Sequence, residues 1–280
     1  MNHDPVGASV ATHPDGGPMS EPRPRITGDE RRWQNAVGGR LQEQAYARAG
    51  TRAVLDRQHA RIAALLAPTP DMRVLDLGCG VGHLLAWLHQ HAAAHYHGLD
   101  LSLNSLRTAR AAGLHDLCVG DAEHLPVRDA SYDAVVCNGA AHHLPDLPAA
   151  LREIHRVLRP GGRLVFHEPV DSPLTSAIRQ TLFRWSPYES PADLSHKHAF
   201  TRAVVVRTMG ETGFVEIAAT AHEFLAYPLS GMYMALPWSG SRRVLGALIG
   251  LEARLERVVW LRSVCNALSW RVLFTARRPV

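Results

Sequence analysis

The sequence predicts a doubly wound α/β fold built on a mostly parallel, seven-stranded sheet. From residue 72 onward, short apolar runs alternate with amphipathic helical patterns. Strands that are nearly all apolar are typical of a parallel sheet covered by helices on both faces. The first of these runs ends in a cluster of alternating glycines, "GCGVG" at 78–82, and a helical segment follows at once. This order of strand, glycine loop and helix is the opening unit of such a fold.

Seven segments carry the strand pattern and four carry the helical pattern between them. The strand segments are Arg73–Leu77, Tyr96–Asp100, Asp116–Val119, Tyr132–Cys137, Arg163–His167, Phe214–Ala221 and Trp270–Ala276. The helical segments are Gly82–Ala93, Leu103–Ala112, Leu147–Leu158 and Thr201–Glu211. The stretch "LRPGG" at 158–162 predicts a helix stop followed by a tight turn into the fifth strand.

The composition predicts one domain with a disordered tail. The tail, rich in Pro, Gly and Asp, covers 1–27, and a single domain covers 28–280. We expect the following parts within that domain: N-terminal helices at 28–70, the core at 71–170, a lid and helix at 171–212, and a helical insertion before the last strand at 223–270.

Charge and cysteine content exclude several classes of protein. The 30 Lys and Arg residues barely exceed the 26 Asp and Glu residues and are spread along the chain, so no nucleic-acid partner is expected. The four cysteines have no paired spacing, which predicts free thiols and a cytoplasmic location. We expect no membrane span, because no run reaches about 18 apolar residues. We expect no signal peptide, because the first residues lack a basic region joined to an apolar one.

The spacing of the glycine loop narrows the expected ligand. Gly78, Gly80 and Gly82 form G-x-G-x-G rather than the dinucleotide pattern G-x-G-x-x-G, and no G-K-[ST] follows to make a P-loop. Asp100 ends the second strand, 18 positions after Gly82. A carboxylate at that point can accept both hydroxyls of a ribose, so the sequence predicts a nucleoside ligand without a 2′-phosphate.

Four segments in this order resemble the motifs of class I S-adenosylmethionine-dependent methyltransferases. They are "VLDLGCGVGHLL", "GLDLS", "VGDAEHLPVRDASYDAVVCNGAAHHL" and "LREIHRVLRPGGRLVFHEP", and together they cover about residues 70–170. More narrowly, the chain is similar to the group that includes ubiquinone/menaquinone methyltransferases and many small-molecule enzymes. The resemblance implies a Rossmann-like sheet, a cofactor-binding core at 71–170, S-adenosyl-L-methionine as cofactor, and methyl transfer. A nicotinamide-dependent oxidoreductase and a non-catalytic nucleoside-binding module stay open as alternatives.

For the methionine end of the cofactor, the resemblance implies roles for five residues. Asp76 and Gly78 border the methionine amino group, and Gly80 leaves room for the cofactor. Asn138 and Gly139 end the fourth strand and line the cofactor near its sulfonium.

For the adenosine end, the resemblance implies roles for four more. Asp100 takes the ribose hydroxyls, and Leu101 packs against adenine. Asp121 accepts a hydrogen bond from the adenine amino group, with Ala122 alongside. Turn formation is the alternative role for Asp121, and for Asp133 we expect a purely structural role in a turn.

Three residues are candidates for proton removal from the methyl acceptor. His142 follows the fourth strand, and His167 and Glu168 end the fifth, so all three flank the predicted crevice. A neutral imidazole there can act as a general base near pH 7. The alternative is that His142 and His143 only cap the loop before the next helix.

Histidine content by itself predicts no metal site. The chain contains 17 histidines, and His89, His91, His95 and His97 lie close together in the sequence. These four straddle the end of a helix and the start of a strand, and no CxxC or HExxH motif accompanies them. We therefore expect surface or packing roles for them.

The acceptor is expected to be a small or lipid-like molecule, such as a quinone, polyketide or prenyl compound. The stretch "NGAAHHL" lacks the Asn/Asp-Pro-Pro-aromatic motif of enzymes that methylate nucleic-acid bases or protein glutamine. In the insertion, an adaptable apolar wall is predicted from Met232, Tyr233, Met234 and Trp238. Three roles for the insertion stay open: acceptor pocket, dimer face, or basic amphipathic surface for a membrane. A helix that covers apolar core is the structural alternative.

Overall fold

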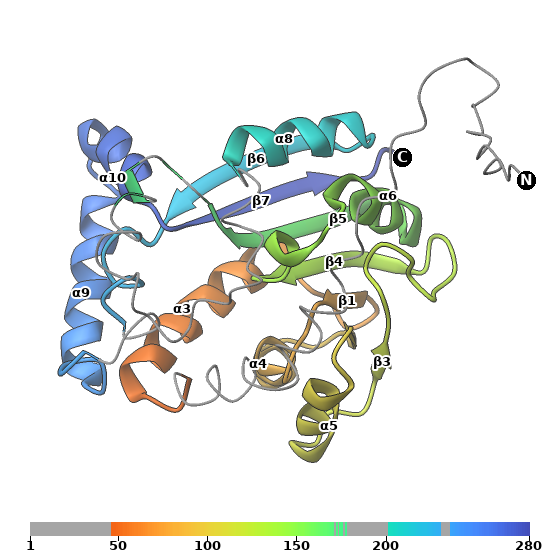
Figure 1. The fold of residues 1–280 in the computed structure, drawn as a ribbon, viewed down its shortest axis with the longest axis horizontal. Helices are drawn as coiled ribbons and strands as arrows, with labels where there is room; N and C mark the ends of the chain where they lie inside the picture. The colour runs from red at the N-terminus through yellow and green to blue at the C-terminus, as the bar shows by residue number, and fades with distance from the viewer. Residues whose placement is uncertain (1–45, 171, 173, 176, 178–200, 231–235) are drawn as a thin grey trace, which may run out of the picture.

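The computed structural model describes residues 46–170, 172, 174, 175, 177, 201–230 and 236–280. Within these residues, one seven-stranded sheet has the order β3-β2-β1-β4-β5-β7-β6 (Figure 1). Strands β1 to β5 are parallel to one another, and β7 runs antiparallel to both β5 and β6. The predicted doubly wound, mostly parallel sheet is therefore confirmed.

The strand bounds follow the sequence prediction closely, with one exception. The strands are β1 Arg73–Leu77, β2 His95–Asp100, β3 Leu117–Val119, β4 Tyr132–Asn138, β5 Leu158–Pro169, β6 Val215–His222 and β7 Arg271–Arg277. The exception is β5, which begins at Leu158 but carries a bulge where the tight turn was predicted: Leu158 pairs with Tyr132, and the next pair is Arg163 with Ala134. Gly161 has a φ of +76°, and its amide donates to the Arg278 carbonyl (3.0 Å), so the distant end of the chain holds this bulge in place.

The helices lie where the periodicity predicts them. They are α3 Ala49–Leu66, α4 His83–His91, α5 Leu103–Ala111, α6 Leu147–Val157, α8 Arg202–Glu211, α9 Arg242–Leu255 and α10 Arg262–Leu268, with short 3₁₀ helices η2 Ala141–His143 and η4 Val259–Leu261. Four of them begin at a side chain that accepts a backbone N–H three residues on, at Ser102, Asp146, Thr201 and Ser241. In the described part of the chain, no helix has the length and apolar content to cross a membrane. The predicted tail and residues 178–200 of the predicted lid lie outside the described residues.

Two apolar layers sandwich the sheet because alternate strand residues point to opposite faces. On one face, Leu75, Val135 and Phe166 pack under α6 and α8. On the other face, Val74 and Val136 pack under α3, α4 and α5. Both faces are thus covered, which leaves the ends of the strands as the place for a ligand.

The predicted insertion packs on the N-terminal helix rather than on the sheet. Leu245 of α9 is fully buried against Val54 of α3 and Trp270. The buried Glu252 carboxylate accepts hydrogen bonds from the Arg57 guanidinium of α3 and from the backbone amides of Leu225 and Ala226 (both 2.9 Å). This face of α9 therefore covers apolar core, as the structural alternative expected.

Candidate active site

All nine residues predicted to contact the cofactor lie at the carboxyl ends of four neighbouring strands. The order β3-β2-β1-β4 places these ends side by side at one edge of the sheet. The glycine loop is tied to that edge, because the backbone amides of Gly78 and Cys79 both donate to the Leu99 carbonyl (2.7 and 3.1 Å). The structure thus brings together residues that are up to 63 positions apart, from Asp76 to Gly139.

Asp100 holds the glycine loop in place with its carboxylate. Its Oδ2 accepts the Gly80 amide (2.7 Å), and its Oδ1 accepts the Ser102 amide (2.8 Å). Burial raises the pKa of Asp100, and these two backbone hydrogen bonds oppose that rise. The residue therefore has a structural role in addition to the predicted contact with ribose.

The surroundings explain differently why each of the three loop positions is a glycine. A Cβ at Gly78 would lie 2.3 Å from the Ala140 Cβ, and one at Gly82 would lie 2.2 Å from the Leu114 Cδ1. Gly80 has a φ of +54°, and a Cβ there would meet nothing within 4 Å. Gly78 and Gly82 therefore permit close packing, whereas Gly80 borders open space.

Asp76, on the strand that leads into the glycine loop, offers a buried carboxylate oxygen. The residue is 2% exposed, and its Oδ2 has no hydrogen-bond partner among the described residues. Burial and the neighbouring Asp100 raise the pKa of Asp76 to about 8. An ammonium group bound here would supply the missing hydrogen bond and stabilise the ionised carboxylate. The site thus fits the cationic amino group of a methionine moiety.

Two further aspartates have structural contacts. Asp121 Oδ1 accepts the Glu123 amide (2.9 Å), which is the turn interaction considered as its alternative role. Asp133 accepts the Arg73 amide (2.8 Å) and the Arg159 guanidinium (2.6 Å) at the opposite end of the strands. The structural role predicted for Asp133 is confirmed, although it links β1, β4 and β5 rather than forming a turn.

His142 and Glu168 form a hydrogen-bonded pair next to the end of β4. The His142 Nδ1 lies 2.8 Å from the Glu168 Oε2, and the side chain of Glu168 is fully buried. Oε1 of Glu168 accepts the amides of Ala140 and Ala141 (both 3.0 Å). Burial alone would raise the pKa of Glu168, but the hydrogen bond from His142 and the amides holds it below its ordinary value. An ionised Glu168 orients His142 with Nδ1 as the proton donor and Nε2 as the basic nitrogen.

His167 lies apart from this pair, in a buried polar cluster. Its Nδ1 is 2.8 Å from the Asn138 Oδ1, and its ring stacks on that of His222 at 4.9 Å. Burial, together with Arg271 and His222, places the pKa of His167 well below its ordinary value. The three candidates for a base therefore separate into the pair His142–Glu168 and a neutral, enclosed His167.

Sequence reasoning missed the partners in this cluster. The buried Arg271 guanidinium donates to the Tyr227 hydroxyl (3.1 Å), the Asn138 Oδ1 (3.3 Å) and the His167 carbonyl (2.9 Å). Its only local signal is a cation at the start of an apolar strand, in "WRVLF". His222 is the last residue of β6, and Glu223 follows it. No sequence motif surrounds either residue.

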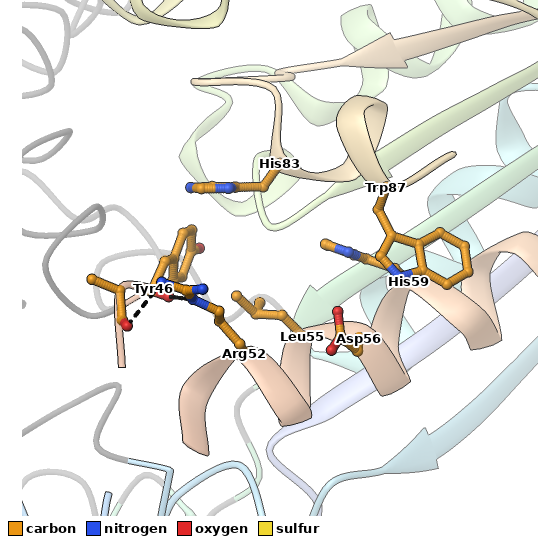
Figure 2. A pocket seen from close by; sticks show the side chains of 8 residues that line it. Tyr46, Arg52, Leu55, Asp56, His59, His83 and Trp87 are labelled. Carbon is orange, nitrogen blue, oxygen red and sulfur yellow. Dashed lines mark hydrogen bonds between the residues drawn. The ribbon is translucent and has the colours of Figure 1, made fainter. Parts of the chain in front are cut away.

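A pocket of about 360 Å³ lies between α3 and α4, next to the glycine loop (Figure 2). Its lining residues, which the sequence did not single out, are Tyr46, Ala47, Arg52, Leu55, Asp56, His59, His83 and Trp87. The ring of His83, the first residue of α4, meets Tyr46 edge-on at 4.7 Å. The pocket is thus an aromatic and histidine-lined hollow that opens beside the expected position of the cofactor.

Comparison with known proteins identifies similar chains. A family model described as a methyltransferase domain matches residues 75–166. Methyltransferase GfsG of Streptomyces halstedii is 42% identical over 105 residues, which are 35% of this chain and 38% of that protein. The malonyl-[acyl-carrier protein] O-methyltransferase of Erwinia billingiae is 32% identical over 226 residues, which are 76% of this chain and 79% of the relative.

The solved structure of geranyl diphosphate methyltransferase, in complex with GPP and sinefungin, shares the fold. Its TM-score is 0.60 at 18% identity, and the match covers 90% of this chain and 99% of that one. The chain spans less than two thirds of GfsG and of two further malonyl-[acyl-carrier protein] O-methyltransferases, at 38%, 66% and 46% of their lengths.

Proposed function

The chain belongs to the S-adenosylmethionine-dependent methyltransferases, and from this premise we propose that it methylates a small, apolar or lipid-like acceptor. The observation that carries the proposal is the buried, unpartnered carboxylate oxygen of Asp76, on the strand that leads into the glycine loop. The named substrates of the relatives support a small organic acceptor: a malonyl group on a carrier protein is a small acyl group, and geranyl diphosphate carries an apolar prenyl chain. Nothing in these comparisons supports a nicotinamide oxidoreductase or a non-catalytic binding module.

The residues at the carboxyl edge would hold S-adenosyl-L-methionine, which supplies an electrophilic methyl group. Asp76 and Gly78 would bind the methionine amino group, and Asp100 would accept the ribose hydroxyls with Leu101 against the adenine. Asp121 and Ala122 would border the adenine, and Asn138 and Gly139 would lie near the methyl group. The buried position of Asp76 favours this arrangement, because an unpaired buried carboxylate is costly until a cation binds it.

The acceptor would approach from the side of α3 and the insertion. Tyr227, in the segment that follows β6, is linked through Arg271 to Asn138 at the end of β4 (3.1 and 3.3 Å). The first part of the insertion therefore reaches the point where the methyl group is expected. The pocket between α3 and α4 adds a second, partly apolar wall. Held there, the acceptor would be aligned for in-line displacement with water excluded.

His142 would remove the acceptor's proton where the acceptor carries one. Glu168 orients the imidazole and stabilises its protonated form, as a carboxylate does in other His-carboxylate pairs. In this proposal His167 serves to position Asn138, since its ring is enclosed and its Nδ1 lies 2.8 Å from the Asn138 Oδ1.

The proposal also includes a cytoplasmic location for the enzyme and a contact surface on α9 and α10. All four cysteines are free, which fits a cytoplasmic enzyme. Exposed apolar side chains on and beside α9 and α10, Val244, Leu251, Trp260 and Val264, support contact with a membrane surface or a second copy. The first alternative fits the interspersed arginines of the insertion better, because anionic headgroups attract them.

The test is a labelling experiment with the full chain. The protein is incubated with methyl-labelled S-adenosylmethionine and either cell extract or defined quinones, prenyl diphosphates and malonyl thioesters. We expect label in one small organic product, identified by mass spectrometry, and less of it with the Asp100→Ala variant when the cofactor is below saturation. Label confined to nucleic acid or to amino-acid side chains of proteins would contradict the proposal.

Cofactor affinity should depend on pH through Asp76. The pKa of Asp76 is raised to about 8 in the free protein, so most molecules carry a neutral carboxyl at pH 6. Since the ammonium group of the cofactor binds the carboxylate, affinity should rise by up to about tenfold per pH unit below the pKa and level off above it. Calorimetry from pH 6 to 9 measures this slope. Asp76→Asn should bind weakly at every pH, and an unchanged slope in that variant would contradict the role of Asp76.

Replacing Tyr233 and Trp238 with alanine should raise the KM for the acceptor by about tenfold and leave cofactor affinity alone. Tyr233, Met232 and Met234 lie outside the described residues, and Trp238 is 40% exposed. Steady-state kinetics with the identified acceptor checks the result. Val215→Ala is the control, because Val215 is 43% exposed at the start of β6, at the opposite end of the strand from the insertion. Equal loss of both affinities would show that 231–238 is structural.

A further inference from the structure

Three metal-ligating side chains meet at the ends of β5 and β6. His167 of β5, His222 of β6 and Glu223 each offer a donor atom, and these atoms lie within 4.8 Å of one another. All three side chains are at least 97% buried. The separation between the His222 Nδ1 and the Glu223 Oε1 is 3.7 Å, too long for a hydrogen bond and short enough for two ligands of one ion.

Donor atoms of this cluster lack partners among the described residues. They are His167 Nε2, His222 Nδ1, His222 Nε2 and Glu223 Oε1. Each buried polar atom left unsatisfied costs about 1–3 kcal/mol. Four such atoms in one cluster therefore indicate that a bound polar group or ion completes the site.

Two of the ligands are oriented by a second hydrogen bond, as in established metal sites. The His167 Nδ1 lies 2.8 Å from the Asn138 Oδ1, which fixes Nδ1 as the protonated nitrogen and leaves the lone pair on Nε2. The Glu223 Oε2 accepts the Gln58 amide (2.7 Å), which leaves Oε1 for a ligand. In both cases the atom without a partner is the one that faces the cluster.

The buried Arg271 guanidinium beside the cluster makes its hydrogen bonds elsewhere. The Arg271 guanidinium is hydrogen-bonded to Tyr227, Asn138 and the His167 carbonyl, and so it leaves the donor atoms of the cluster open.

We propose that His167, His222 and Glu223 bind one divalent transition-metal ion. Two imidazoles and a carboxylate are a common ligand set for zinc, whereas Mg²⁺ prefers an all-oxygen shell. The rings of His167 and His222 are nearly parallel at 13°, so one of them rotates to direct its nitrogen at the ion. Since Arg271 places a positive charge beside the site, the affinity is below that of a closed four-ligand zinc site. This site stands independently of the methyl-transfer reaction.

The test is metal binding by the full chain after removal of metals with a chelator. Titration with Zn²⁺ against a chromogenic competitor should show one ion per chain, with no competition from Mg²⁺. We expect His222→Ala and Glu223→Gln to lose this binding. Gln58→Leu, which removes only the hydrogen bond to Glu223, should weaken it by about 10–100-fold. His115→Ala removes an exposed histidine away from the cluster and should change nothing.

Two spectroscopic measurements separate the cluster from surface histidines. The Co²⁺ form should show visible d–d absorption in the wild-type chain and in His115→Ala, and none in His222→Ala. The X-ray absorption spectrum of the wild-type zinc complex, which needs no variant, should show scattering from two imidazoles. Absence of a tight Zn²⁺ site in the wild-type chain, equal binding by His222→Ala, or a spectrum without imidazole each overturns the proposal.

Discussion

Replacing His142 with alanine is expected to lower turnover by about 10²–10⁴-fold while cofactor affinity is largely kept. The variant removes the imidazole that would take the acceptor's proton. It leaves Glu168 in place, still bound by the amides of Ala140 and Ala141. Because the loss falls on proton transfer, it should appear in kcat and not in the binding of S-adenosylmethionine. The prediction applies to a hydroxyl or activated-carbon acceptor, which must lose a proton.

Two further variants separate His142 from its neighbours. Glu168→Gln keeps a partner for His142 but removes the carboxylate charge, and should lower kcat less than His142→Ala. His143→Ala is the matched control, because its ring lies beside that of His142 at 4.0 Å without the bond to Glu168. Near-normal turnover in the alanine variants of His142, His167 and Glu168 would mean that catalysis proceeds by proximity and orientation alone.

Replacing Asp100 with alanine is expected to weaken S-adenosylmethionine binding by about 1–3 kcal/mol. Two losses contribute: the hydrogen bonds to the ribose, and the two backbone bonds that hold Gly80 and Ser102. Isothermal calorimetry measures the change directly, with S-adenosylhomocysteine as a second ligand and NAD as the negative control. No heat of binding is expected for NAD, since the loop lacks the dinucleotide spacing.

Asp133→Ala is the matched control for this variant. Asp133 also accepts a backbone amide and bonds a second group, but at the opposite ends of the strands. It should lower the free energy of unfolding and leave cofactor affinity unchanged. Binding of NAD by the wild-type chain, or an unaltered S-adenosylmethionine affinity in Asp100→Ala, would refute the assignment.

The sequence by itself determined the sheet and the cofactor edge. The bounds of β1 agree with the prediction at both ends, and β2, β3, β4, β6 and β7 differ by about one residue. These features depend on local signals: apolar runs of strand length, helical periodicity, and glycines where the chain must turn closely. Since parallel strands align their carboxyl ends, locating the strands also located Asp76, Asp100 and Asn138 at one edge. Their individual contacts with the cofactor stay predictions.

Only the tertiary structure decided which polar groups meet. Glu168 pairs with His142 across 26 positions, and Arg271 binds Asn138 across 133 positions. The gathering of His167, His222 and Glu223 depends on β7 lying antiparallel between β5 and β6, and the placing of α9 on α3 depends on the buried Glu252. No periodicity encodes such contacts, because each results from the packing of segments far apart in the chain. The energy of a buried polar group depends on the partner that this packing supplies.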